Sequence, residues 1–244
     1  MKDYQPSTYG DRIADVYDEW YGELDPGTAV TTLAELAGGG PALELAIGTG
    51  RIALPLAATG LEVHGIDVSG QMVARLREKP GGGEVPVTIG DFADVGVAGA
   101  YRLVYVAFNT FFALLTQDDQ VRCFENVAAH LTPDGVFVIE AFVPDVTRFD
   151  RGQRLSVEKI ETESVTIHAA RHDALTQQVS SHHLVLSEGV EPRFQPVRIR
   201  YAWPSELDLM ARLAGLRLRD RWAGWEREEF TADSVQHVSV YARA

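Results

Sequence analysis

The stretch from Pro41 to Arg51, PALELAIGTGR, constrains the fold more than any other part of the chain. Ala42 to Ala46 is a short, mostly apolar run of the kind that is buried on both faces of a parallel sheet. Gly48 and Gly50 then allow a tight turn of bare backbone, and a helix is expected from Ile52 to Thr59. Because the first amides of a helix have no partner within it, they favour an anionic or acceptor-rich ligand at this turn.

Two kinds of nucleotide-binding site use such a turn. The letters GTGRIA fit the dinucleotide fingerprint G-x-G-x-x-A, and Asp67 lies near the distance at which a ribose-binding acid is expected. Glu44 argues against a dinucleotide, because an acid at the strand end would repel a pyrophosphate and would accept a positively charged or ammonium-bearing ligand. The strand also begins only after a long helix-like segment, which the dinucleotide fold does not predict.

A third signature, Gly90-Asp91-Phe92, follows the third expected strand, Val85 to Ile89. The series E-x-A-x-G-x-G, then I-D at Asp67, then G-D-F resembles the class I S-adenosylmethionine-dependent methyltransferases, over nearly the whole chain. The resemblance implies S-adenosylmethionine as the cofactor. It also implies an α/β fold, with a Rossmann-like, doubly wound, mostly parallel sheet of seven strands whose last strand is antiparallel.

The resemblance carries cofactor-binding roles onto individual residues. Asp67 would accept both ribose hydroxyls, although a helix-capping role is its alternative, and Asp91 would bind the adenine amino group while Phe92 flanks the ring. Met72 could touch adenine, with core packing as an equal alternative. The expected cofactor-binding residues are Tyr9, Glu44, Ala46, Gly48, Gly50, Arg51, Asp67, Val68, Met72, Gly90, Asp91, Phe92 and Phe108.

One amphipathic helix is expected from Tyr9 to Tyr21, because its apolar residues fall at offsets of three and four. Spacing alone favours a helix that faces the core. The resemblance adds a second interpretation, in which an amino-terminal helical cap closes over the cofactor and its tyrosines reach the methionine carboxylate or the sulfonium. Tyr9 and Tyr17 are the candidates, since each offers a ring and a hydroxyl.

The acceptor is expected beyond the fourth strand, Tyr101 to Ala107, because ligands of a doubly wound sheet bind beyond the carboxyl ends of its strands. Asn109 is polar among aromatic residues, so it either orients the substrate or ties the loop, and neither role is preferred. Phe112 either contacts the substrate or fills the core. Glu140 is expected to be a structural acid. The expected catalytic residues are Tyr17 and Asn109, and the expected substrate-binding residues are Tyr17, Asn109, Phe112 and Phe142.

From Asp150 the pattern changes to extended segments alone. Their alternation predicts a small antiparallel sheet, inserted after the fifth strand as a lid or wall over the substrate. The chain is therefore interpreted as one domain over 1–244 with an inserted β subdomain at 152–203. The extended segments are Leu155 to His168, Gln177 to Ser187 and Phe194 to Trp203. Other helices are expected from Asp25 to Leu36, Ser69 to Arg77, Asp118 to His130 and Pro204 to Gly215, and other strands at Glu62 to Ile66, Val136 to Phe142, Arg217 to Trp222 and His237 to Ala242.

Composition limits the partners. A chain of 244 residues with 45 per cent hydrophobic content can bury a full core, and a net charge of -13 disfavours nucleic acid or an anionic membrane as a partner. Cys123 is the only cysteine and is interpreted as a buried, inert thiol. The first residues lack the apolar core of a signal peptide and no run is long enough to span a bilayer, so a cytoplasmic protein is expected. A homo-oligomer is an open option.

The chemistry of methyl transfer narrows the acceptor. Transfer from a sulfonium is an in-line displacement, so an enzyme must mainly hold nucleophile, methyl and sulfur in a line. A neutral amine has its lone pair ready, whereas an oxygen acceptor needs a base or a metal, and the sequence has no closely spaced Cys and His set for a metal.

The sequence therefore favours a small-molecule N-methyltransferase, similar to antibiotic-pathway enzymes that methylate amino groups of sugars or of amino-acid-derived intermediates. His182 and His183 point to opposite faces of a strand, so only one of them could face a substrate, and a surface or core role is preferred for both. The alternatives are an O-methyltransferase with a histidine base, a dehydrogenase of the dinucleotide type, and a non-catalytic cofactor-binding scaffold.

Overall fold

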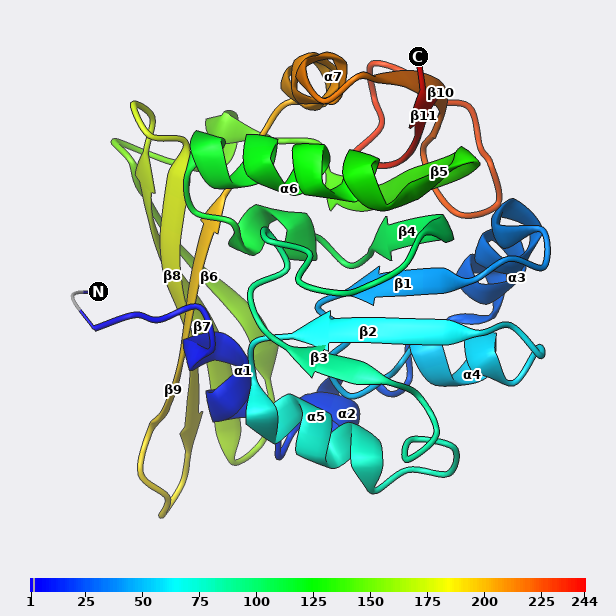
Figure 1. Ribbon diagram of the computed structural model, residues 1–244. Helices are drawn as coiled ribbons and strands as arrows, with labels where there is room; N and C mark the ends of the chain where they lie inside the picture. Colours follow the sequence, from blue (N-terminus) through cyan, green and yellow to red (C-terminus); the bar gives the residue numbers. More distant parts are fainter. Residues whose placement is uncertain (2) are drawn as a thin grey trace.

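Two β-sheets organise the molecule, which is seen here in a computed structural model (Figure 1). The structure describes Met1 and residues 3–244; Lys2, in the amino-terminal stretch considered above for a signal peptide, lies outside the described residues. The larger sheet consists of β1 (Ala42–Leu45), β2 (Val63–Asp67), β3 (Val87–Ile89), β4 (Tyr101–Val106), β5 (Leu131–Phe142), β10 (Leu216–Trp222) and β11 (Gln236–Arg243). The smaller sheet consists of β6 (Gln153–Ile160), β7 (Ser164–Asp173), β8 (Gln178–Ser187) and β9 (Arg193–Arg200).

The larger sheet has the strand order β10-β11-β5-β4-β1-β2-β3. The pairs from β3 to β5 are parallel, and β11 is antiparallel to both β5 and β10. The expected mostly parallel sheet of seven strands, with an antiparallel last strand, is therefore confirmed. The helices are α1 (Thr8–Ile13), α2 (Tyr17–Tyr21), α3 (Gly27–Ala37), α4 (Ala53–Ala57), α5 (Gly70–Arg77), α6 (Gln117–His130) and α7 (Pro204–Leu213), and the short 3-10 helices are η1 (Thr110–Ala113) and η2 (Val146–Arg148).

The core lies on both faces of the larger sheet. Successive side chains of a strand point to opposite faces, so Leu43 joins one core cluster and Ala42 the other. Helices α6 and α7 cover the first face, where Phe124 and Cys123 are fully buried, and α3 and α4 cover the second, where Leu33 packs. The expected burial of the single cysteine is confirmed. Among the described residues, no helix combines the length and the apolar character needed to cross a membrane.

The amino-terminal helix is interrupted, so the prediction of one helix from Tyr9 to Tyr21 is wrong. Helix α1 ends at Ile13 and α2 begins at Tyr17. The break lets α1 contact β9 and α5, while α2 turns and brings Asp18 to the glycine turn after β1. The apolar spacing is that of a helix, but it carries no signal for a break that contains neither glycine nor proline.

The inserted sheet has four strands, so the prediction of a single extended segment from Leu155 to His168 is also wrong. Strands β6 and β7 are separated by a turn, which is closed by Glu161 N donating to Ser164 O at 2.9 Å. A bulge between Val157 and Lys159 shifts the pairing of β6 with β7. The turn has no glycine, proline or asparagine, which are the residues that usually mark a reversal.

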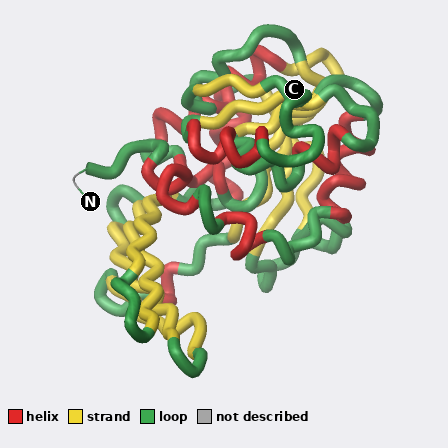
Figure 2. Tube along the Cα trace, turned by 90° about the horizontal axis from the view of Figure 1, so that it is seen from below, coloured by secondary structure: helices red, strands yellow, loops and turns green. Residues whose placement is uncertain are grey.

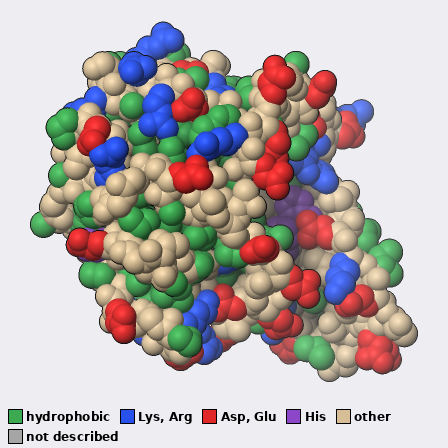
Figure 3. All heavy atoms as spheres, turned by 90° about the vertical axis from the view of Figure 1, so that its right-hand side faces the viewer, with side chains coloured by type: hydrophobic (Ala, Val, Ile, Leu, Met, Phe, Trp, Pro, Cys, Tyr) green, Lys and Arg blue, Asp and Glu red, His purple; other side chains and the backbone are tan. Residues whose placement is uncertain are grey.

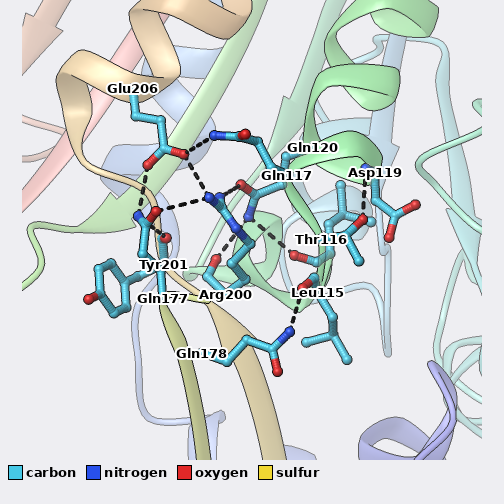
Figure 4. Close-up of polar contacts among 11 residues, drawn as sticks. Leu115, Thr116, Gln117, Asp119, Gln120, Gln177, Gln178, Arg200, Tyr201 and Glu206 are labelled. Carbon is cyan, nitrogen blue, oxygen red and sulfur yellow. Dashed lines mark hydrogen bonds and ion pairs between the residues drawn. The ribbon is translucent and has the colours of Figure 1, made fainter. Parts of the chain in front are cut away.

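The smaller sheet is joined to the larger sheet's helices by a buried polar cluster around Arg200, at the end of β9 (Figure 4). The guanidinium donates to Gln120 Oε1 of α6 at 2.5 Å, to Gln177 Oε1 at 3.0 Å and to Glu206 Oε1 of α7 at 2.7 Å. Burial alone would raise the pKa of Glu206, but hydrogen bonds from Gln177, Arg200 and Gln117 outweigh it and lower that pKa. Apart from contacts of this kind near β9, the sheet extends away from the rest of the molecule, as Figure 2 shows from below.

Candidate active site

The turn after β1 presents open backbone at the carboxyl end of the sheet. Ala46, Gly48 and Gly50 all have left-handed backbone conformations, with φ of 58°, 58° and 79°. Alanine adopts this region at a cost of roughly 1 kcal/mol, whereas glycine adopts it freely. A Cβ placed on Gly48 would have nothing within 4 Å, so the turn faces open space and a ligand can lie directly on it.

Glu44 is a buried carboxylate beside this turn. Only 5% of its surface is exposed, and Tyr105 Oη donates to its Oε2 at 3.0 Å. Burial raises the pKa of Glu44 to about 8, although the bond from Tyr105 and the Arg51 charge act in the other direction. A positively charged group placed beside Glu44 would favour its ionised form, so the residue suits an ammonium-bearing ligand.

Asp67, at the end of β2, already holds two backbone amides. Gly48 N donates to Oδ2 at 2.7 Å and Ser69 N donates to Oδ1 at 2.8 Å, so the carboxylate fixes the turn after β1 to the turn after β2. Burial raises the pKa of Asp67, and these two bonds oppose that shift. Each carboxylate oxygen can accept a further bond, so the predicted contact with a ribose is compatible with the geometry. Ser69 caps α5 by accepting from Met72 N at 3.2 Å.

Arg51 and Tyr17 meet over the turn. The Arg51 guanidinium lies 4.8 Å from the centre of the Phe108 ring, and its buried Nε has no hydrogen-bond partner among the described residues. Burial raises the pKa of Tyr17, and the nearby positive charge of Arg51 opposes that shift. A partly buried guanidinium with a free donor is the arrangement that accepts a carboxylate, and it lies where the methionine carboxylate of S-adenosylmethionine would be needed. The residues present therefore fit this cofactor.

The sequence did not single out Tyr21, which completes the aromatic wall. Its ring centre lies 4.9 Å from that of Tyr17 and 5.2 Å from that of Phe108. Burial and the neighbouring tyrosine raise the pKa of Tyr9 far above its ordinary value. Tyr21 lies four residues after Tyr17, so the helical spacing could have identified it.

Three aspartates that were not expected from the sequence fasten the amino-terminal segment to its surroundings. Asp11 Oδ1 accepts from Ser69 Oγ at 2.6 Å, and Asp15 forms an ion pair with Arg75. Asp18 accepts from Thr49 Oγ1 at 2.7 Å and pairs with Lys79 at 2.7 Å. The offsets of four and three between these aspartates are a signal that could have been read as a polar stripe opposite the apolar one.

Asn109 and Glu140 hold the loop after β4. Asn109 has a φ of 66°, and its Oδ1 accepts from Phe142 N at 2.7 Å, so the side chain ties the ends of β4 and β5 together. Glu140 accepts from Phe108 N at 2.7 Å and from Trp225 Nε1 at 2.9 Å. Of the two roles expected for Asn109, the structure shows the loop-tying one, with Phe142 N as its partner. Glu140 is a structural acid, as expected.

Several predicted ligand contacts are instead buried. Phe112 has no exposed surface and packs against Phe142 with ring centres 4.9 Å apart, so its predicted substrate contact is wrong and it supports Phe142 from behind. Met72 is 4% exposed and packs on Ile13, which matches the core alternative. Phe92 is 7% exposed and belongs to the main core cluster.

The remaining predicted cofactor residues lie on the site side of the sheet. Asp91 Oδ1 accepts from Ala93 N at 2.9 Å, which leaves its second oxygen free of described partners. Val68 and Gly90 are partly exposed after β2 and β3, and a Cβ on Gly90 would have nothing within 4 Å. These residues therefore have surface that a nucleoside could contact.

Comparison with known proteins agrees with this geometry. Residues 42–135 match a family described as a methyltransferase domain. The solved structure of the CcbJ methyltransferase from Streptomyces caelestis is 45% identical, with a TM-score of 0.93, over 99% of this chain and 100% of that one. The cypemycin N-terminal methyltransferase of a Streptomyces species is 26% identical over 98% of both chains. The S-adenosylmethionine-bound structure of CalS10, an amino pentose methyltransferase from Micromonospora echinaspora, shares the fold, with a TM-score of 0.69 at 21% identity over 94% of this chain and 97% of that one.

Proposed function

The chain belongs to the S-adenosylmethionine-dependent methyltransferases, and from that premise we propose that it methylates an amino group of a small molecule, such as an aminosugar or another natural-product intermediate. Membership of this enzyme family removes the dehydrogenase and the non-catalytic scaffold from the alternatives.

The choice of nitrogen as the acceptor atom rests on the hydrogen bonds that already occupy Glu140. This carboxylate lies at the end of β5, where an oxygen acceptor would need a base, but each of its oxygens accepts a hydrogen bond from the protein. A neutral amine needs no base for its attack and can lose its proton afterwards. The name of the similar cypemycin N-terminal methyltransferase supports the same choice.

The proposed cofactor contacts use the groups that the protein leaves open. In this proposal Arg51 and the Tyr17 hydroxyl bind the methionine carboxylate, and Glu44 binds the ammonium. Asp67 accepts the ribose hydroxyls with its remaining lone pairs, and Asp91 accepts from the adenine amino group with its free oxygen. The bound cofactor supplies an electrophilic methyl on a sulfonium.

The protein's own part in the reaction is alignment. The rings of Tyr17, Tyr21 and Phe108 form a wall that excludes water and favours a cation in front of it. Asn109 accepts a hydrogen bond from Phe142 N and so fixes the position of the loop that contacts the acceptor. Residues 152–203, as an inserted subdomain of one domain over 1–244, form the far wall of the acceptor site.

Product analysis tests this proposal. The enzyme is incubated with S-adenosylmethionine and separate pools of aminosugars and amino-acid-derived amines, and each pool has a matched pool in which hydroxyl replaces the amino group. Mass spectrometry should show methylated products from the amine pools and none from the hydroxyl pools. Methylation of the hydroxyl pools alone would establish an oxygen acceptor and contradict the proposal.

A further inference from the structure

Two histidines and a glutamate form a cluster on the four-stranded sheet that the site described above does not use. His168 on β7 and His183 on β8 are paired across the ladder, and their ring centres lie 4.7 Å apart. Glu158 of β6 reaches across, and its Oε2 lies 2.8 Å from His183 Nδ1. These three residues are called the histidine cluster below.

The histidine cluster shares its face of the sheet with Val179 and Ile199, which pack against the main core cluster. Lys159, paired with Thr166, shares that face, and its pKa is raised mainly by a hydrogen bond to Glu161, with a contribution from Glu23 just after α2. The face is therefore near the end of the helix that carries Tyr17 and Tyr21. Figure 3 shows histidine side chains in the hollow between the two lobes.

His182 lies on the opposite face, because neighbouring residues of a strand alternate. Burial lowers the pKa of His182, and the charges of Arg12 and of the chain's amino terminus contribute, so its surroundings differ from those of His183. The two adjacent histidines are thus a natural pair for an experiment, since one belongs to the cluster and the other does not.

Glu158 fixes which nitrogen of His183 carries the proton. An ionised carboxylate can only accept, so Nδ1 of His183 donates to it, and the neutral ring keeps a lone pair on Nε2. That Nε2 has no hydrogen-bond partner among the described residues. Gln195, the ladder partner of His183 on β9, is 6% exposed, and its Nε2 also lacks a partner in the described part of the chain. An unpaired acceptor beside an unpaired donor suits a ligand that carries both kinds of group.

Resting on the function proposed above, we propose that the histidine cluster binds the acceptor molecule. His183 Nε2 accepts a hydrogen bond from a hydroxyl or amino group of the acceptor, and Glu158 is a positioning residue that fixes the ring. The ligand class is a neutral or cationic hydroxylated amine. An anionic group is disfavoured, because the Glu158 carboxylate would repel it.

The test compares His183→Gln and His183→Ala with His182→Ala, using the full-length enzyme, saturating S-adenosylmethionine and the amine pool that gives product with the wild type. His183→Ala should raise KM about tenfold with little change in kcat, because one hydrogen bond to the acceptor is lost. His183→Gln keeps an acceptor oxygen near the position of Nε2 and should restore most of the affinity, while His182→Ala should match the wild type. Equal melting temperatures show that the variants fold.

The conservative variants distinguish binding from a structural role, because His183→Gln should restore the KM that His183→Ala raises, whereas a purely structural loss would not be rescued in KM alone. Glu158→Gln should raise KM less than His183→Ala, since its amide oxygen still accepts from Nδ1.

The failures of the two proposals can be told apart. If the wild type methylates amines and His183→Ala has an unchanged KM, the histidine cluster is not the acceptor site and the proposed function stands. If kcat falls and KM does not, His183 acts on the reacting group and the binding role is wrong. If the wild type gives no product from any amine pool, the proposed function and this inference fail together.

Discussion

The two sheets of this protein are built on opposite principles. In the larger sheet, every residue of β1 is buried, and the carboxylates at its active end, Glu44 and Asp67, each have protein partners. In the strands of the four-stranded sheet, only Ala170 and Pro196 are buried apolar residues, whereas Leu155 and Ile160 are 74% and 77% exposed. The larger sheet has its own core, and the smaller one has almost none.

This difference separates a preformed region from an adaptable one. The preformed region, called the preformed end below, is the site at the carboxyl ends of the larger sheet's strands, and the adaptable region is the four-stranded sheet. A site whose polar groups are already fixed by hydrogen bonds to the protein binds its ligand with little rearrangement. Such a site suits a cofactor that is the same in every reaction cycle. A sheet with few buried contacts, anchored mainly near β9, can differ between relatives without harm to the core. The contrast predicts that substitutions at the preformed end affect cofactor binding strongly and that those farther from it affect it less.

The largest expected effect follows from removing the carboxylate that joins the two turns. Asp67→Ala loses the bonds to Gly48 N and Ser69 N as well as the proposed ribose contacts, so S-adenosylhomocysteine affinity should fall by about a hundredfold or more, at roughly 1.5 to 3 kcal/mol for each charged hydrogen bond. Titration calorimetry measures it. Asp94→Ala, which breaks an exposed pair with Arg122, is the control and should leave affinity unchanged. Full affinity in Asp67→Ala would mean that the ribose lies elsewhere.

The pH dependence of cofactor binding tests Glu44, which belongs to the preformed end. Because burial raises the pKa of Glu44 to about 8, the ligand-free site holds a proton that a bound ammonium should displace. Cofactor affinity should therefore rise with pH up to about 8, by at most about tenfold per pH unit, and then level off. Isothermal titrations from pH 6 to 9 would show this curve, and Glu44→Gln should flatten it.

Stability should respond to the same group with the opposite sign. The pKa of Glu44 is higher in the folded chain than in the unfolded chain, so its contribution to stability is largest at low pH and is lost as the pH rises through about 8. The melting temperature of the ligand-free enzyme should fall over that range more than that of Glu44→Gln. Parallel melting curves of the two proteins would show that Glu44 is ionised already at neutral pH.

A smaller effect is expected from one hydroxyl at the edge of the preformed end. Tyr17→Phe removes the hydroxyl proposed to bind the methionine carboxylate but keeps the ring beside Tyr21, so cofactor affinity should fall severalfold, by about 1 kcal/mol, with an unchanged melting temperature. Tyr101→Phe is the matched control. It loses part-buried bonds to Ala98 O and His64 away from the site, so its melting temperature should drop and its affinity should not. If Tyr17→Phe behaves like the control, Tyr17 is a core residue.

The same contrast explains how far the sequence could predict the molecule. The strand, turn and helix around Gly48 are local features that glycine and apolar spacing specify, so the larger sheet was predictable from them. The hydrogen bond that Phe142 N donates to Asn109 Oδ1 joins residues far apart in the sequence, and no local pattern predicts it. Phe112 was ambiguous for a similar reason, since an aromatic residue after a strand can face a ligand or the core.

The four-stranded sheet was harder to predict because its strands have so few buried residues. Alternation was strong enough to indicate β structure, but the turn at 161–163 lacks turn residues and the bulge near Val157 shifts the alternation. The pairing of His183 with Glu158 depends on that bulge, so it could not be read from the sequence.

The smallest expected effect concerns the attachment of the amino-terminal helices, which lie between the two sheets. Asp18→Asn keeps an acceptor for Thr49 Oγ1 but weakens the ion pair with Lys79. The Asp18 side chain is 45% exposed and that of Lys79 is 29% exposed, so only a modest change in cofactor dissociation is expected. The helices should open more often, and S-adenosylhomocysteine should dissociate about threefold faster. High salt screens the ion pair of Asp18 with Lys79 in the wild type, so the two dissociation rates should become equal there. Stopped-flow dissociation at low and high salt measures it. Asp15→Asn is the control, because its pair with Arg75 is more exposed and does not touch the glycine turn, so its dissociation rate should equal that of the wild type. A faster rate in both variants would show that the whole amino-terminal segment, and not the contact with Thr49 and Lys79, holds the cofactor in place.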